Sequence, residues 1–328
     1  DDAICLTVSF LIFQNVMKLI LVTGGTGLVG SALRSVRQKY TEYTYVFLSS
    51  NDCDLTNRDE THKCFQKYNP DYVIHLAANV GGLYKNMNFK VDMFESNLQM
   101  NMNVLNVCHK LKIKKLISCL STCIFPDKTS YPINEEMLHN GAPHHSNDAY
   151  AYAKRMLEVQ SKAYQEQYGD DFSCIIPTNI YGENDNYSLE NGHVVPSLIH
   201  KCHNAKQKGE PFIVRGTGKP LRQFIYAKDM ADLIMWVLEN YKENDSIILS
   251  VGEEDEISIR DIATLIAKNY EYEDMMEFDD SFSDGQYKKT ADNSKLINLY
   301  PDFHFTTVET GIKNSVQWFK DNIDKCRK

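Results

Sequence analysis

The fold is decided by residues 18–30, which read KLILVTGGTGLVG. The apolar run 18–22 predicts a buried strand, and residues 31–40 predict a helix. Between them, glycines at 24, 27 and 30 form a GxxGxxG motif, which lets backbone approach a pyrophosphate at the positive end of a helix. A tight turn that needs glycine only for packing is the alternative. We expect a dinucleotide-binding loop made of Gly24, Gly25, Thr26, Gly27, Leu28, Val29 and Gly30.

The segments that follow this loop alternate between strand and helix patterns. This alternation predicts an α/β fold with a Rossmann-type, doubly wound parallel sheet. Ligands of such sheets bind at the carboxyl ends of the strands, where this chain has Ala77, Ala78 and Ser121. The predicted strands are 45–48, 72–76, 115–120 and 172–177, and the predicted helices are 57–68, 92–111 and one that carries Tyr150.

The residues after the second predicted strand distinguish the two nicotinamide cofactors. NAD enzymes place an acidic side chain about twenty residues after the glycine loop, where it binds the ribose 2′-hydroxyl. The neighbourhood here is Ser49, Ser50 and Asn51, whose side chains do not repel a 2′-phosphate. We therefore predict NADPH/NADP+ as the cofactor, with Ser50 and Asn51 among its contacts. Asp54 and Leu55 can contact adenine, or Asp54 can begin a turn or helix.

The domain organisation follows from where the alternation ends. We assign residues 17–183 to an NADP-binding Rossmann domain and residues 184–328, where loops and short strands dominate, to a smaller C-terminal α/β substrate-binding lobe. No obvious flexible linker separates them, so the lobes are expected to interleave. Residues 1–16 predict an N-terminal extension outside the fold. A degenerate targeting segment is the alternative, although the chain starts with acidic residues where a signal peptide is basic.

Composition excludes several classes of protein. The net charge of −9 argues against broad affinity for nucleic acid or a membrane surface. Nine cysteines at irregular spacing, without a CxxC pair, favour the reduced thiols of a cytoplasmic protein over a disulfide framework. His139, His144 and His145 have no neighbouring acid or cysteine that would complete a metal site, so no metal is predicted.

Four side chains point to carbonyl chemistry. Tyr150 and Lys154 lie four residues apart on one helix face, and we expect the cation to bring the tyrosine's pKa toward working pH, which makes it a proton donor to a carbonyl. Ser121 can donate a hydrogen bond to the same oxygen. Cys123 can reach the adjacent carbon, whose proton becomes acidic once the enolate oxygen is stabilised. The alternative for Tyr150 and Lys154 is that they are ordinary surface side chains. Ser121 can instead be a turn residue, and Cys123 can be a small apolar side chain in the core.

Several longer runs carry a resemblance to known proteins. They are AANVGG (77–82), STCIFP (121–126), HNG (139–141), NGHVVP (191–196) and LRQFIY (221–226). Together with the fold they resemble the extended short-chain dehydrogenase/reductase family, and most closely the GDP-L-fucose synthase family, from about Met17 to the C-terminus. The resemblance implies conversion of GDP-4-dehydro-6-deoxy-D-mannose to GDP-L-fucose. Epimerisation at C3 and C5 would come first, followed by NADPH-dependent reduction at C4.

The resemblance also implies roles for individual residues. Inversion of a carbon needs a base and an acid on opposite faces of the sugar ring, and the family match makes Cys123 the base and His193 the acid. A thiol with an ordinary pKa of about 8.5 must be assisted to act as a base. Implied cofactor contacts beyond the glycine loop are Ala77, Ala78, Tyr150, Lys154, Pro177, Thr178, Asn179, Ile180 and His193.

The GDP-sugar substrate is assigned in the same way. The resemblance places Lys201, Arg222, Asp284 and Lys289 around the GDP moiety, and a planar guanidinium suits a phosphate. Arg215 stands where the family usually has tryptophan. A guanidinium can also stack on a flat base, so Arg215 is kept as a substrate contact.

Rival functions remain open at this point. A nucleotide-sugar 4,6-dehydratase needs an Asp-Glu pair where this chain has Cys123 and Ile124. A 4-epimerase does not need the Cys/His pair, and a non-catalytic NADP-sensing module does not need Ser121, Tyr150 and Lys154. In relatives, helices equivalent to 92–111 and to the Tyr150 helix pair into a four-helix interface, which implies a homodimer. Packing of those helices against the sheet alone is the alternative.

Overall fold

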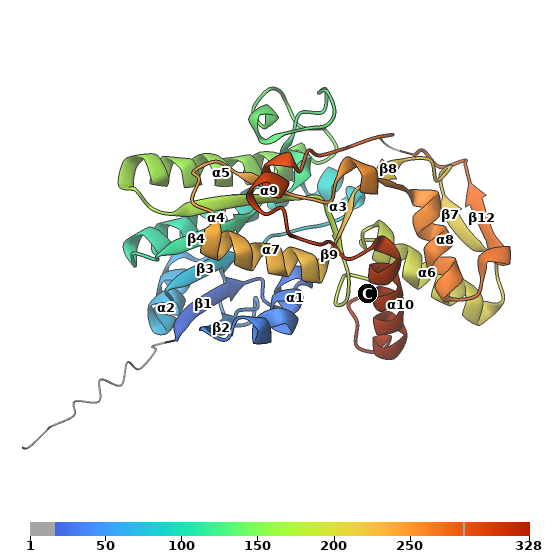
Figure 1. Cartoon of the computed structure of the whole chain (residues 1–328), viewed down its shortest axis with the longest axis horizontal. Helices are drawn as coiled ribbons and strands as arrows, with labels where there is room; N and C mark the ends of the chain where they lie inside the picture. The colour runs from blue at the N-terminus through green and yellow to red at the C-terminus, as the bar shows by residue number, and fades with distance from the viewer. Residues whose placement is uncertain (1–16, 285) are drawn as a thin grey trace, which may run out of the picture.

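The computed structural model describes residues 17–284 and 286–328. Figure 1 shows a larger lobe built on a central sheet, with a smaller lobe beside it that contains β7, β12, α6, α8 and α10. The predicted N-terminal extension at 1–16 lies outside the described residues. No helix in the described ranges is both long enough and apolar enough to cross a membrane.

The central sheet confirms the predicted Rossmann-type fold. All of its pairings are parallel, in the order β10-β5-β4-β3-β1-β2. The order reverses between β1 and β3, and such a switch point is where open parallel sheets bind ligands. The strands are β1 (Lys18–Thr23), β2 (Tyr43–Phe47), β3 (Tyr72–His75), β4 (Lys115–Cys119), β5 (Phe172–Pro177) and β10 (Ile247–Leu249).

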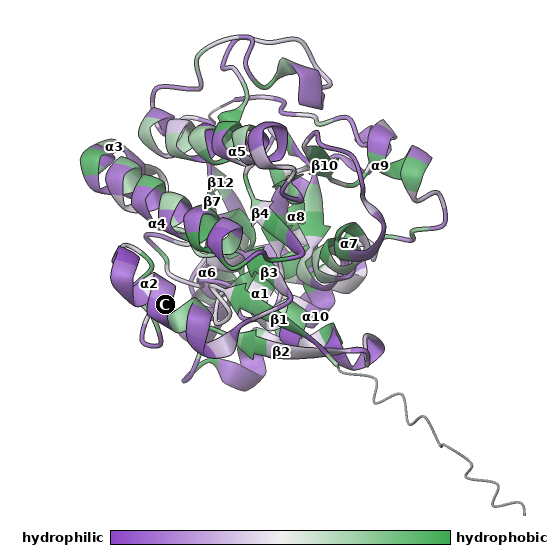
Figure 2. Ribbon diagram, turned by 90° about the vertical axis from the view of Figure 1, so that its left-hand side faces the viewer, coloured by the Kyte–Doolittle hydropathy of each residue, from purple (hydrophilic) through white to green (hydrophobic). Residues whose placement is uncertain are grey.

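Helices cover both faces of this sheet. Side chains alternate along β1, so that Leu21 joins one apolar core while Ile20 and Val22 join the other. Burial on both faces explains why the strands are continuously apolar, as the green strands of Figure 2 show. One face is covered by α2 (Arg58–Tyr68), α4 (Lys90–Lys110) and α5 (Asp148–Tyr168), and the other by α1 (Leu28–Val36), α7 (Ala227–Asn240) and α9 (Ser294–Leu299).

Helix α1 begins earlier than predicted. The sequence predicted a start at Ser31, whereas Gly27 is the N-cap and the first helical residue is Leu28, inside the glycine motif itself. Helix α1 ends at Val36, and the 3₁₀ helix η1 (Arg37–Lys39) occupies most of the remainder of the predicted helix 31–40. The early start brings the helix N-terminus directly to the loop that was predicted to hold a pyrophosphate.

The second lobe has its own apolar core, formed by residues such as Phe212, Val214, Ile266 and Phe319. Its main elements are α6 (Val194–Lys208), β7 (Phe212–Arg215), α8 (Ile259–Asn269), β12 (Met276–Asp279) and α10 (Val308–Asn322). The shorter elements of the chain are α3 (Leu83–Asn88), η2 (Thr122–Ile124), η3 (Glu135–Met137), β6 (Asn179–Tyr181), β8 (Leu221–Arg222), β9 (Phe224–Tyr226), η4 (Glu253–Asp255), β11 (Ile257–Ser258) and η5 (Glu273–Met275).

The chain returns to the first lobe after residue 226. Helix α7 packs on α1, and β10 pairs with β5 at the edge of the sheet. Ile247, Ile248 and Leu249 are fully buried, so this short apolar strand gains by joining the sheet. The predicted boundary at 183 therefore does not separate the elements of the sheet, since residues 227–249 lie beyond it in sequence.

Candidate active site

The glycine loop is held against the end of β3. Gly24 has a φ of +66°, and a Cβ there would lie 2.8 Å from the Ala77 nitrogen. A Cβ on Gly30 would lie 2.6 Å from the Gly24 carbonyl oxygen. These contacts leave no room for a side chain, so both positions require glycine.

The start of α1 suits a bound dinucleotide. Gly27 offers no side-chain cap, and the first turn carries no acidic residue, so the first helical amides remain available to an anion. A Cβ on Gly27 would meet a single atom, the Gly24 carbonyl oxygen at 3.3 Å. The loop residues Gly24 to Gly30 therefore fit the pyrophosphate of a nicotinamide cofactor.

The sequence analysis expected the side chains of residues 49–51, in the turn after β2, to face the ribose 2′-phosphate, but Ser49 already has an acceptor within the protein. The Ser49 amide and hydroxyl both donate to Asp52 Oδ2, at 2.7 and 2.6 Å, and the Asn51 amide donates to Ser49 Oγ at 3.3 Å. The carboxylate of Asp52 thus occupies the donors of Ser49. The Asp54 carboxylate accepts from the Thr56 amide and hydroxyl, as a turn aspartate does.

A cation that the sequence analysis missed lies next to this turn. The Arg34 guanidinium, on α1, is 4.3 Å from the ring centroid of Phe47, the last residue of β2. A pocket of about 380 Å³ runs along this part of the molecule, lined by Arg34 together with Gly25 and Thr26 of the glycine loop. Arg34 is therefore placed to meet an anionic group near the end of β2. An arginine at the fourth position after the last glycine was the available signal.

Buried polar side chains fix the end of β3. The Leu76 and Ala77 amides donate to Thr23 Oγ1, each at 3.2 Å, so the Thr23 hydroxyl donates to His75 Nδ1 at 2.8 Å. The other ring nitrogen of His75 donates to Asn101 Oδ1 at 3.0 Å. Burial lowers the pKa of His75 to about 3, which keeps the ring neutral. This network holds Ala77 and Ala78 beside the glycine loop.

Ser121 and Cys123 follow β4 directly. Ser121 is the N-cap of η2, and its hydroxyl accepts from the Cys123 amide at 3.4 Å. Burial raises the pKa of the Cys123 thiol, whereas the Lys289 ammonium, the Ser121 hydroxyl and the Lys154 ammonium lower it. Burial has the largest effect, so the pKa of this thiol lies above its ordinary value although the neighbouring groups oppose the rise.

Tyr150 and Lys154 are both buried on α5 and lie on the same side of the helix. The Lys154 ammonium is 5.9 Å from the Tyr150 ring centroid and donates to the Cys119 carbonyl at 2.8 Å. The expectation that Lys154 brings the Tyr150 pKa toward working pH is wrong for this structure. Burial raises the pKa of the phenol well above its ordinary value, and the thiols of Cys123 and Cys119 raise it further. Tyr150 is therefore a neutral phenol that holds a proton to donate.

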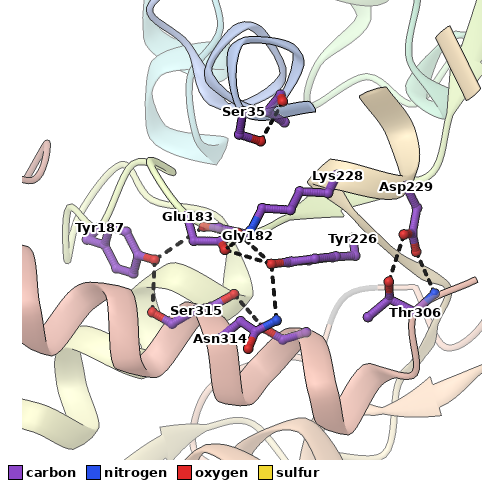
Figure 3. Close-up of polar contacts among 12 residues, drawn as sticks. Ser35, Gly182, Glu183, Tyr187, Tyr226, Lys228, Asp229, Thr306, Asn314 and Ser315 are labelled. Carbon is purple, nitrogen blue, oxygen red and sulfur yellow. Dashed lines mark hydrogen bonds and ion pairs between the residues drawn. The ribbon is translucent and has the colours of Figure 1, made fainter. Parts of the chain in front are cut away.

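His193 lies at the end of a compact loop in the second lobe. The loop begins at Glu183, whose carboxylate accepts from the Tyr226 hydroxyl and pairs with Lys228 at 2.7 Å, as Figure 3 shows. The Tyr187 hydroxyl in turn donates to the Gly182 carbonyl at 3.2 Å. Residues 190–191 lie next to the start of α3, because a Cβ on Gly82 would lie 3.6 Å from Asn191 Cα. His193, the exposed N-cap of α6, follows at once.

A buried carboxylate in the same loop was also missed. Asp185 is 3% exposed, and its Oδ2 has no hydrogen-bond partner. Burial raises the pKa of Asp185 to about 6, although His193 and Arg327 oppose that rise. Asp185 therefore acts electrostatically on His193. An isolated aspartate eight residues before a histidine gave no periodic signal in the sequence.

Three of the five predicted substrate residues, Lys201, Arg215 and Asp284, lie near the end of β7. The Arg215 guanidinium is 4.6 Å from the Phe282 ring centroid. Burial lowers the pKa of Lys201, and the positive charge of Arg215 lowers it further. Asp284 accepts from the Thr217 amide at 2.7 Å and hydroxyl at 2.6 Å, so it holds the turn after β7. Phe282 supplies an aromatic ring next to the position where the family usually has tryptophan.

The other two predicted substrate residues lie closer to Cys123. The Arg222 guanidinium donates to the Leu221 and Gln286 carbonyls, at 2.7 and 2.8 Å. Lys289 interacts electrostatically with Cys123 and Arg222. The structure thus brings Ser121, Cys123, Tyr150, Lys154 and Lys289 into one electrostatic cluster.

The segment after β5 links the two lobes. The Asn179 side chain donates to the Gln223 carbonyl at 2.9 Å, and the Thr178 hydroxyl donates to Ser250 Oγ at 3.1 Å. Pro177 ends β5 and Ile180 lies in β6. Across the described residues, no cluster of three or more His, Cys, Asp and Glu side chains is arranged to hold a metal ion.

The fold and the site together define a nicotinamide-dependent short-chain dehydrogenase or epimerase, with its glycine loop after the first strand and a Tyr-x-x-x-Lys pair after the fourth. Residues 20–252 match the model of the NAD dependent epimerase/dehydratase family. The GDP-L-fucose synthase of Dictyostelium discoideum is 53% identical over 317 residues, which cover 95% of this chain and 98% of that protein. The chain belongs to the NAD dependent epimerase/dehydratase family and, within it, to the GDP-L-fucose synthases.

Further relatives agree with this assignment. A probable GDP-L-fucose synthase of Drosophila melanogaster is 48% identical, over 95% of this chain and 100% of its own. The crystal structure of a GDP-L-fucose synthetase from Naegleria fowleri bound to NADP has a TM-score of 0.92 and 50% identity, and the match covers 95% of each chain. The resemblance drawn from the sequence motifs is confirmed.

Proposed function

We propose that the protein converts GDP-4-dehydro-6-deoxy-D-mannose to GDP-L-fucose, by epimerisation at C3 and C5 followed by NADPH-dependent reduction at C4. The observation that carries the proposal is Cys123, held beside Ser121, Tyr150 and Lys154 at the end of β4. A 4,6-dehydratase would need carboxyl groups at that place. The relatives at 53% and 48% identity carry the name of this activity.

Epimerisation needs a thiolate and an acid. Cys123 takes the proton from C3 or C5, the C–H electron pair moves onto the C4 oxygen as an enolate, and Ser121 and Tyr150 donate hydrogen bonds to that oxygen. His193 then delivers a proton to the opposite face of the same carbon.

Reduction uses the same oxygen. Bound NADPH supplies the hydride to C4. Tyr150, which burial keeps as a neutral phenol, delivers its proton to the C4 oxygen. The ammonium of Lys154, bonded to the Cys119 carbonyl, remains close enough to stabilise the phenolate that is left.

Binding is assigned by charge and shape. The glycine loop holds the cofactor pyrophosphate, with Ser50, Asn51, Asp54, Leu55, Ala77, Ala78 and the segment 177–180 as further contacts. In a chain of net charge −9, Lys201, Arg215 and Arg222 supply local positive charge for the diphosphate of a GDP sugar. Arg215 and Phe282 together offer a flat surface for the guanine base.

The decisive test follows NADPH oxidation with GDP-4-dehydro-6-deoxy-D-mannose as substrate. We expect turnover, and GDP-L-fucose as the product by mass spectrometry and NMR. In D2O, Cys123→Ser should abolish deuterium entry at C3 and C5. Tyr150→Phe should slow C4 reduction about 100-fold or more while the Kd for NADPH stays within about twofold. Normal exchange in the Cys123 variant would eliminate the thiol as the base.

We also propose a homodimer in the cytoplasm. Helices α4 and α5 pack side by side and leave Val91 and Met102 exposed on α4, and Tyr152, Met156 and Val159 exposed on α5. The three α5 positions recur every three to four residues and therefore line one face. An apolar face of this kind supports a four-helix interface. Free thiols throughout the described cysteines support a reducing compartment.

A further inference from the structure

A strap of chain, residues 286–292, lies against the loop that follows β4. The Gln286 side chain donates to Asp127 Oδ1 at 3.1 Å. Further along, the Ile133 amide donates to the Thr290 carbonyl at 2.9 Å. The first lobe therefore fixes the strap near both of its ends.

The second lobe holds the opposite edge of the strap. The Leu221 amide donates to the Tyr287 carbonyl at 2.8 Å, and the Arg222 guanidinium donates to the Gln286 carbonyl at 2.8 Å. The backbone of the strap is thus held between the two lobes.

Two adjacent lysines on the strap have different surroundings. Lys288 pairs with Glu253 at 2.6 Å and with Glu256 at 3.4 Å. Lys289 is half-buried, and within the described part of the chain its ammonium has neither a hydrogen-bond acceptor nor an ion-pair partner. A half-buried ammonium without a partner is costly, so its charge is available to a group that forms or binds there.

Burial has the largest effect on the pKa of Lys289. The charged or titratable groups that also affect this pKa are, in decreasing order, Cys123, Arg222 and Asp127. Arg222 repels the ammonium, and Asp127 is already bonded to Gln286. Cys123 is influenced by Lys289 more than by any other charged residue. The remaining titratable or charged side chains that interact with Cys123 belong to α5 and are Tyr150, Lys154 and Arg155.

We propose that Lys289 is the cation that stabilises the thiolate form of Cys123 against the effect of burial, and that it serves proton abstraction instead of binding the GDP moiety. This inference rests on the proposed function and assigns one further residue to the same site. The strap carries the ammonium across from the second lobe to the sulfur, so the base is completed only when both lobes are in place. Lys289 acts through Cys123 and is a positioning residue.

The chemical step remains balanced with this role. The thiolate forms an S–H bond as the C–H bond of C3 or C5 breaks, and the electron pair moves to the C4 oxygen. Lys289 keeps its proton throughout. A cation next to the sulfur lowers the free energy of the thiolate relative to the thiol, which offsets the rise that burial causes.

The test measures alkylation of Cys123 by iodoacetamide in the full-length protein, as a function of pH, with peptide mass spectrometry to separate Cys123 from the other cysteines. For Lys289→Met we expect the midpoint of the pH profile to rise and alkylation at pH 7.5 to slow about tenfold, since one pKa unit corresponds to a tenfold change in thiolate below the midpoint. Lys289→Arg keeps the charge and should retain most of the wild-type rate.

Three further measurements separate this role from others. Lys288→Met removes the adjacent, paired lysine and should leave the Cys123 profile unchanged. The Kd for GDP, by calorimetry, should change less than about twofold in Lys289→Met. Deuterium entry at C3 and C5 should fall in parallel with alkylation. A tenfold loss of GDP affinity with an unchanged Cys123 profile would overturn the proposal, and so would an unchanged profile with unchanged GDP affinity.

The alkylation and GDP-binding measurements do not depend on turnover. If the protein fails to oxidise NADPH with the proposed substrate, the alkylation profile still shows whether Lys289 supports the thiolate. If Lys289→Met lowers the unfolding temperature, the Cys123 alkylation rate of Lys289→Arg is compared with that of the wild-type protein instead. The two rates must then be similar. A tenfold slower rate in a folded Lys289→Arg protein would contradict a role for the charge.

Discussion

The Arg34 guanidinium lies where the glycine loop meets the end of β2. Phe47 supports it from below, and Gly25 packs against Phe47, since a Cβ on Gly25 would lie 2.6 Å from the Phe47 Cβ. The neighbouring donors of Ser49 are occupied by Asp52. A cofactor that carries a 2′-phosphate therefore needs a cation at this place, and Arg34 provides one.

Replacement of Arg34 by leucine should weaken NADP+ binding selectively. We expect the Kd for NADP+ to rise about tenfold or more, because a charged hydrogen bond contributes about 1.5–3 kcal/mol, while the Kd for NAD+ changes little. Isothermal titration calorimetry with both nucleotides provides the measurement. Arg37→Leu, in the turn directly after α1, is the matched control. Equal losses for both nucleotides in Arg34→Leu would contradict the assignment.

Ionisation of the buried Asp185 carboxyl group lowers the free energy of unfolding of the protein. Its pKa is about 6 in the folded protein against an ordinary 3.8, so the folded state binds the proton more tightly than the unfolded state. The sign follows directly: ionisation in the fold is unfavourable, so the contribution of Asp185 to stability falls as pH rises from about 4 to about 6 and stays low above that. The site tolerates this cost because the carboxylate acts on His193.

Asp185→Asn should therefore stabilise the protein at pH 7.5. We expect a gain on the order of 3 kcal/mol in the free energy of unfolding, at about 1.36 kcal/mol per pKa unit, and a smaller gain as pH falls toward 4. Urea denaturation at several pH values measures it. Deuterium exchange at C3 and C5 should slow in the same variant. A loss of stability at pH 7.5 would mean that the carboxylate is favourably paired there.

One buried histidine joins β1, β3 and α4. His75, at the end of β3, accepts from Thr23 of β1 and donates to Asn101 of α4. Its pKa of about 3 means that the ring stays neutral in the fold while it titrates near 6.5 when unfolded. The stabilisation from His75 is therefore complete above pH 6.5 and is lost as pH falls from 6.5 toward 3.

His75→Gln should flatten the acid limb of the stability profile. Between pH 7 and pH 5 we expect the wild-type protein to lose on the order of 2 kcal/mol more than the variant, because only the wild type must exclude a proton from a buried ring. The free energy of unfolding in urea at pH 7, 6 and 5 supplies the comparison. The variant will be less stable at pH 7, so the slope is the informative quantity. Parallel profiles would show that His75 is not the group that titrates.

At the level of these elements, sequence patterns predicted the strands well and the helix starts less well. The strand predicted at 172–177 is observed with those bounds, since continuous apolar character specifies a strand buried on both faces. Helix α1 starts three residues before the predicted position because the glycine motif itself forms the N-cap. The short strand β10 was not predicted, since a three-residue apolar run has no period to detect.

Assembly is a property of the whole molecule. The exposed apolar face on α4 and α5 lies away from the sheet, and the proposed homodimer would bury it. Because both helices are packed on the sheet that carries the active site, association would also restrain α5, which bears Tyr150 and Lys154.

Met156→Asp should separate the subunits. We expect sedimentation equilibrium to give twice the chain mass of 37.7 kDa for the wild-type protein and a single chain mass for the variant, because a carboxylate at the centre of an apolar interface is desolvated without a partner. Met275→Asp, an exposed methionine in the second lobe, is the control and should leave the mass unchanged. A wild-type mass of one chain would contradict the dimer.

The sequence by itself determined five of the six strands of the sheet, the glycine loop and the Ser121, Tyr150 and Lys154 motif residues. Each of these depends on local spacing, whether apolar period, the conformational freedom of glycine, or a four-residue helical repeat. Local spacing also carries the motifs by which the family was recognised. These features can be read in order along the chain because the physical cause lies within a few residues.

Only the tertiary structure decided which distant side chains share a site. It placed Lys289 beside Cys123, Arg34 over Phe47 and Asp185 near His193, and it returned residues 227–249 to the sheet. It also reversed the expected pKa shift of Tyr150, since burial of the phenol and the thiols of Cys123 and Cys119 raise that pKa. Burial and contact between separated segments follow from how the whole chain packs, and no local pattern encodes them.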